Sequence, residues 1–143
     1  MIFFLPVIAI LCETLGGKAV FTIGLVGKWF VFSASGLRLF IAGIKQVIDP
    51  GFTTTEIFKI TDTSGFPIVR ELGFANICFG TLGIISLFMP EWRVPAAFCS
   101  GMYYAFAAFV HIFKKSRSAN ENFALITDIY VFAVLAVYFV ALI

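Results

Sequence analysis

The sequence predicts an all-α fold, a bundle of four to five transmembrane helices in a single domain that covers all 143 residues. Hydrophobic residues make up 61% of the chain and charged residues only 13%, and the mean hydropathy is +1.03. This composition lies outside the range of water-soluble globular domains, so lipid is the expected solvent for most of the chain. At roughly 20 residues for each crossing, the length excludes a large domain outside the membrane.

The second half of the chain contains three clear transmembrane segments. Residues 94–113 and 124–143 are continuous apolar runs that are long enough to cross the hydrocarbon core of a bilayer. Residues 68–89 form a third predicted helix, which ends at Pro90. Trp92 lies in the short link that follows, where an interfacial aromatic residue is expected.

The amino-terminal third allows two interpretations, because charged residues interrupt its apolar sequence. The favoured interpretation places a first helix at residues 2–25, where Lys18 partly screens Glu13, and a second helix at residues 28–47. Both helices then have ordinary membrane length. The alternative ends the first helix at the glycine pair that begins with Gly16 and makes the second helix very long.

Residues 50–67 form the one long polar loop of the predicted bundle, and they include a short capped helix at the membrane surface. Lys28 and Arg93 are the main basic residues at the opposite end of the bundle. The end that carries the loop holds Lys45, Lys59, Arg70, Lys114, Lys115 and Arg117. Basic residues favour the cytoplasmic side, so the loop is expected in the cytoplasm of a multi-pass protein of the cell membrane.

Polar side chains from four helices fall in the same cytoplasmic half of this topology. The candidate ligand-binding residues are Arg38, Arg70, Glu71, Asn76, His111, Asn120, Glu121 and Asp128. An ionisable side chain in a bilayer costs roughly 2.5–3.5 kcal/mol unless it is paired or hydrated. We therefore expect the central ionisable residues to face the bundle interior as one connected cluster. These central residues are Arg38, Glu71, His111 and Asp128.

Two interpretations of this cluster remain open from the sequence. It can be a paired network that fixes the helix register, in which Arg38 or Arg70 neutralises Glu71 or Asp128. It can also form the wall of a ligand or ion pocket. Glu71 is the favoured functional residue, because it is a carboxylate that directly follows an arginine at a helix start. The helix dipole contributes only about 0.3–1 kcal/mol there, which does not explain a buried charge.

The sequence contains no pattern that predicts catalytic residues, a metal site or a particular cofactor. A serine nucleophile motif and a glycine-rich phosphate loop are missing, and a single histidine excludes bis-histidine haem ligation within one chain. His111 and scattered carboxylates lack a metal-ligand spacing, and the three cysteines form no C-x-x-C pair. The basic residues are dispersed, so nucleic acid is not an expected partner.

Several strings resemble an uncharacterised family of small prokaryotic integral membrane proteins, known as a domain of unknown function. They are KWFVFSASGLRLFIAGIKQ, FTTTEIF, VRELGFANICFGTLGIISL and NENFALITD, together with His111, and RELGFAN is the most specific piece. The resemblance runs from about Lys28 onward and implies a multi-helix membrane protein without a known biochemical role. Its motif positions are Lys28, Trp29, Arg38, Arg70, Glu71, Gly73, Asn76, His111, Asn120, Glu121 and Asp128. A looser likeness in size and helix count is to DoxX-like membrane proteins, some of which associate with oxidoreductases.

The favoured function is a non-enzymatic membrane module or subunit that binds an ion, a lipid or a small molecule through the polar cluster. Its expected partners are the lipid bilayer and either further copies of the chain or a larger membrane complex. One alternative is an intramembrane enzyme, or an oxidoreductase-associated subunit, that acts on a quinone or isoprenoid-type substrate with Glu71, Asp128 or His111 as acid or base. A second alternative is a small transporter or channel, which the lack of an internal repeat disfavours.

Overall fold

The computed structural model describes residues 2–114 and 117–142, and these residues form helices and turns without a strand. Four helical segments are long and apolar enough to cross a membrane. These observations confirm the predicted all-α bundle. The elements are α1 (Phe4–Leu15), α2 (Ile23–Phe30), the π-helix η1 (Val31–Leu37), α3 (Arg38–Ile48), α4 (Pro50–Phe52), η2 (Thr53–Ile57), η3 (Thr63–Gly65), α5 (Phe66–Ile85), η4 (Pro90–Trp92), α6 (Arg93–Ile112) and α7 (Ala119–Val140).

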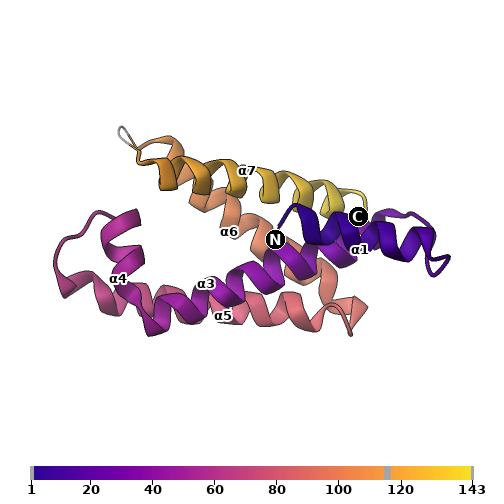
Figure 1. The fold of residues 1–143 in the computed structure, drawn as a ribbon, viewed down its shortest axis with the longest axis horizontal. Helices are drawn as coiled ribbons and strands as arrows, with labels where there is room; N and C mark the ends of the chain where they lie inside the picture. Colours follow the sequence, from indigo (N-terminus) through magenta and orange to yellow (C-terminus); the bar gives the residue numbers. More distant parts are fainter. Residues whose placement is uncertain (1, 115–116, 143) are drawn as a thin grey trace.

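The long helices form two packed pairs. The helices α2, η1 and α3 form one rod, in which η1 and α3 pack along α5 and α2 contacts α7, while α6 packs along α7. The two pairs meet near η1 and separate toward the end of the molecule that carries α4 (Figure 1). Any polar contact between α3 and α7 therefore ties the two pairs together across this junction.

Glycines allow the rod and α5 to approach closely. A Cβ atom added at Gly83 would lie 2.3 Å from the backbone nitrogen of Gly36, and one added at Gly43 would lie 2.5 Å from the carbonyl oxygen of Gly73. These distances are too short for any side chain larger than a hydrogen atom. The backbones of the two helices are therefore in contact along one face.

The favoured boundary of the first helix, at residue 25, is wrong. The helix α1 ends at Leu15, and Gly17 adopts a φ of 67° that favours glycine and turns the chain. Helix α2 begins after Thr22, whose side chain accepts a hydrogen bond from the backbone nitrogen of Leu25. The structure thus follows the alternative interpretation, with a 26-residue segment from Ile23 to Ile48.

The short helix α1 carries the first acidic residue of the chain. Its 12 residues span about 18 Å, which is less than the roughly 30 Å of a hydrocarbon core. The carboxylate of Glu13 lies 2.6 Å from Nζ of Lys28, so a residue of α2 neutralises it instead of the expected Lys18. This ion pair fastens α1 to the end of the bundle opposite α4.

The remaining boundaries differ from the predicted ones by a few residues. The last helix begins at Ala119 and not at residue 124, because Ser118 and Glu121 form a capping box at its start. The predicted loop at residues 50–67 folds back as a hook, which we define as residues 50–62. Within it, the hydroxyl of Thr54 donates to the carbonyl of Pro50 over 2.8 Å. Short helical turns at 50–57 occupy the place of the expected surface helix.

Candidate functional site

A buried ion pair joins the two helix pairs in the middle of the bundle. Nη2 of Arg38, at the start of α3, lies 2.7 Å from Oδ1 of Asp128 in α7 and 3.1 Å from the hydroxyl oxygen of Thr127. The side chain of Asp128 is 7% exposed, whereas that of Arg38 is 24% exposed. The structure therefore brings together two of the predicted residues, and the guanidinium is the more accessible partner.

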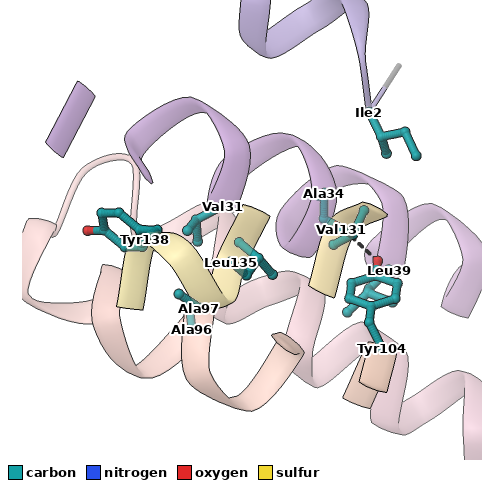
Figure 2. Packing of buried hydrophobic residues seen from close by; sticks show 10 residues of the cluster. All are labelled: Ile2, Val31, Ala34, Leu39, Ala96, Ala97, Tyr104, Val131, Leu135 and Tyr138. Carbon is teal, nitrogen blue, oxygen red and sulfur yellow. Dashed lines mark hydrogen bonds between the residues drawn. The ribbon is translucent and has the colours of Figure 1, made fainter. Parts of the chain in front are cut away.

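The π-helix before Arg38 determines how this residue is held. The backbone N–H of Arg38 donates to the carbonyl of Ser33, five residues earlier, so the carbonyl of Ala34 loses its usual helical partner. The hydroxyl of Tyr104 donates to that carbonyl over 2.7 Å, as Figure 2 shows. The ring of the same tyrosine lies 4.9 Å from the guanidinium carbon of Arg38. Tyr104 thus supports both the distorted backbone and the charge.

Asn76 contributes a buried amide from α5. Its Nδ2 donates to Oε1 of Gln46 over 2.8 Å, and the residue is only 2% exposed. Oδ1 of the same amide has no hydrogen-bond partner among the described residues. The hydroxyl of Tyr103 lies beside Asn76, without the geometry of a hydrogen bond to Oδ1, and within electrostatic range of Arg38 and Asp128. Asn76 is therefore linked to the ion pair through Tyr103 and keeps a free acceptor.

His111 completes the group of polar residues around the ion pair. It lies within electrostatic range of Asp128, and its Nδ1 is buried without a hydrogen-bond partner among the described residues. Nη1 of Arg38 is buried and unpartnered in the same way. We call Arg38, Asn76, His111 and Asp128 the junction site, because each residue comes from a different long helix.

Arg70 and Glu71 lie outside the junction site, and the prediction that Glu71 faces the bundle interior is wrong. Both residues are exposed, and the described residues give neither side chain an ion pair or hydrogen bond. The buried face of α5 is made by Val69, Gly73, Asn76, Gly80 and Gly83. Positions 70 and 71 fall off this face, because a helix repeats every 3.6 residues. Asn120 is exposed as well.

Glu121 belongs to a separate polar group at the turn between α6 and α7. Its buried carboxylate forms a short ion pair with Lys114 and accepts a hydrogen bond from the backbone of Ser118 over 2.8 Å. Lys114 also donates to the carbonyl of Ile57 over 3.4 Å, which ties this turn to the hook. Glu121 therefore holds the end of the bundle together, away from the ion pair. Lys115, which entered the count of basic residues, lies outside the described residues.

The hollows of the surface are apolar and lie on helix faces that point outward. One of about 410 Å³ is lined by Phe109, Val110, Phe113 and Lys114, and another of about 150 Å³ lies between α6 and α7. Neither is lined by a residue of the junction site. Among the described residues, no group of three or more His, Cys, Asp or Glu could hold a metal ion.

Sequence reasoning missed three features of the site. Thr127 accepts a hydrogen bond from Arg38, and Gln46 accepts one from Asn76. Neither was predicted, because each is an uncharged residue that lies next to a charged one in the sequence. The π-helix Val31–Leu37 has no pattern of its own in the sequence.

Replacing Tyr104 with Phe should lower the free energy of unfolding by about 1–3 kcal/mol, because it leaves the buried carbonyl of Ala34 unpaired. Tyr130 provides the matched control, since its hydroxyl makes no hydrogen bond to a described residue. Tyr130→Phe should change the stability by less than about 0.5 kcal/mol. Reversible unfolding in detergent measures both values, and equal effects of the two substitutions would remove Tyr104 from its supporting role.

Comparison with known proteins adds a family but no activity. The family model described as "Family of unknown function (DUF6790)" matches residues 1–142. No curated protein and no solved structure matches the chain. The match extends the resemblance, expected from about Lys28 onward, over nearly the whole sequence, including α1. The chain belongs to this family of unknown function.

Proposed function

We propose that this chain is a multi-pass protein of the cell membrane that binds a small molecule at the junction site without transforming it. Four apolar segments of 22 to 26 residues support the membrane location. Large hydrophobic side chains are exposed along them, as expected for helices that face lipid. The binding role rests on one observation, the hydrogen-bonding capacity that remains unused around the Arg38–Asp128 ion pair.

Buried polar atoms without a hydrogen-bond partner destabilise a fold, and the junction site holds three of them. They are Nη1 of Arg38, Oδ1 of Asn76 and Nδ1 of His111. Leaving a buried donor or acceptor unpaired costs about 1–3 kcal/mol for each group. A bound molecule that pairs with these atoms would recover part of this free energy. The same atoms, arranged around a fixed ion pair, would also orient that molecule.

The carboxylate of Asp128 favours binding over catalysis, because it is already held in an ion pair. Asp128 is engaged by Nη2 of Arg38 at 2.7 Å, and the same nitrogen contacts Thr127, so the carboxylate is held as an ion-pair partner. A general base must instead be free to take a proton from a substrate. Glu71, a second candidate acid or base, is exposed on α5. The module can act alone or as a subunit of a larger membrane assembly.

The proposed orientation places the hook in the cytoplasm. The end of the bundle with the hook carries Lys45, Lys59, Arg70, Lys114 and Arg117. The other end carries Lys18, Lys28 and Arg93, and Lys28 is neutralised by Glu13. An excess of basic residues in short loops marks the cytoplasmic side.

This orientation is testable by labelling single cysteines in a variant that lacks the native cysteines 12, 78 and 99. Ser64→Cys and Glu91→Cys introduce thiols at exposed positions on opposite ends of the bundle. In intact cells, an impermeant maleimide should label only Glu91→Cys, and Ser64→Cys should react only after permeabilisation. The reversed pattern would overturn the orientation, and loss of both proteins from the membrane fraction would overturn the location.

The binding role predicts that a molecule from the native membrane stays on the purified protein. Native mass spectrometry after extraction into mild detergent should show a discrete mass above the 15.8 kDa of the chain. Asn76→Leu removes a buried amide of the site without touching the ion pair and should abolish that added mass. Thr81→Val is the control, because Thr81 is exposed on the same helix and its hydroxyl bonds only the carbonyl of Ile77. A wild-type protein without added mass, or an Asn76→Leu protein that retains it, would contradict the proposal.

A further inference from the structure

We propose that the junction site takes an uncharged molecule from the lipid phase whose polar head carries a hydroxyl group, as a monoacylglycerol does. This inference rests on the proposed function and names the chemical class of the ligand. It follows from the charge balance of the site, from the kinds of hydrogen-bonding atoms left unused, and from the depth of the site along an apolar segment.

The charge of the site is already balanced. The cation of Arg38 faces the anion of Asp128 at 2.7 Å. The amides of Asn76 and Gln46 and the phenols of Tyr103 and Tyr104, which surround this pair, add no charge to it. The nearby ion pair of Lys114 and Glu121 is balanced as well. A charged head would therefore enter a neutral, poorly hydrated site without a counterion.

The unused atoms select the hydrogen-bonding character of the head. Nη1 of Arg38 can only donate, so it requires an acceptor on the ligand. Oδ1 of Asn76 can only accept, so it requires a donor. A hydroxyl group supplies both, whereas an ester or ketone carbonyl supplies only the acceptor. If the oxygen and nitrogen of the Asn76 amide are exchanged, the hydroxyl of the ligand can accept a hydrogen bond from Nδ2.

The depth of Arg38 sets the surroundings of the site. Its side chain is 24% exposed, although Nη1 itself is buried, and Asp128 and Asn76 are almost completely buried. Arg38 lies ten residues before the end of α3 at Ile48, which corresponds to about 15 Å along the helix. This depth is close to the middle of a hydrocarbon core of about 30 Å. At that depth the surroundings of the bundle are apolar, so a charged head is strongly disfavoured there.

Three probes with the same oleoyl tail test the inference on the unaltered protein. Monoolein has a neutral head with hydroxyl groups, methyl oleate has a neutral head with acceptors only, and oleate is an anion at alkaline pH. The ligand-stripped wild-type protein in detergent should bind monoolein about tenfold more tightly than either competitor, as measured by native mass spectrometry. Equal binding of the three probes, or tighter binding of oleate or methyl oleate, would overturn the inference.

Two variants show that this preference comes from the junction site. Asn76→Leu should lose the preference for monoolein over methyl oleate, while Thr81→Val should keep it. Asp128→Asn leaves the charge of Arg38 unbalanced and should shift the preference toward oleate. A monoolein preference that survives in Asn76→Leu would place binding elsewhere and contradict the inference.

The two proposals fail in different ways. If the native added mass depends on Asn76 but the wild-type protein shows no preference for monoolein, the ligand class is wrong and the binding role stands. If no native mass is present and no probe discriminates wild type from Asn76→Leu, both proposals fail.

Discussion

The ion pair between Arg38 and Asp128 is the interaction on which the arrangement of this bundle depends. A guanidinium group near the middle of an apolar 26-residue segment needs a partner, since an unpaired charge at that depth is strongly unfavourable. The partner comes from α7, in the other helix pair, so the pairing fixes α3 and α7 in one register. The two pairs separate toward the hook (Figure 1).

The local structure around the pair follows from the same requirement. The π-helix adds a residue to the turn before Arg38 and frees the carbonyl of Ala34, which Tyr104 then satisfies. Close contact of Gly36 with Gly83 lets this widened turn lie directly against α5. Packing, backbone distortion and charge therefore meet within one turn of the helix. π-Helices of this kind occur frequently at functional sites, which agrees with the placement of the junction site.

Much of the fold was predictable from the sequence, because apolar runs long enough to cross a membrane are strong signals. The pairing of Arg38 with Asp128 was also among the expected alternatives, since both residues are charged and fall in the same half of the predicted bundle. The position of Glu71 was not predictable in the same way. Its exposure depends on which face of α5 the glycines turn toward α3, and a shift of one residue moves a side chain by about 100°. The predicted end of the first helix is wrong. The apolar sequence favours a helix of ordinary membrane length, whereas the chain stops being helical at Gly16 and Gly17. The partner of Glu13 is 15 residues away, across a turn whose geometry the sequence does not specify.

A double-mutant cycle on Arg38 and Asp128 tests the central claim most directly, with reversible unfolding in mixed micelles as the measurement. Arg38→Met and Asp128→Leu each leave one buried charge unpaired and should each destabilise the protein by about 3–5 kcal/mol. The double variant should be far more stable than the sum of the single effects predicts, because it removes both charges together. The partly exposed pair of Glu13 and Lys28 should show a coupling energy of at most about 1 kcal/mol. Additive effects of Arg38→Met and Asp128→Leu would show that the two helix pairs are held together by something other than this ion pair.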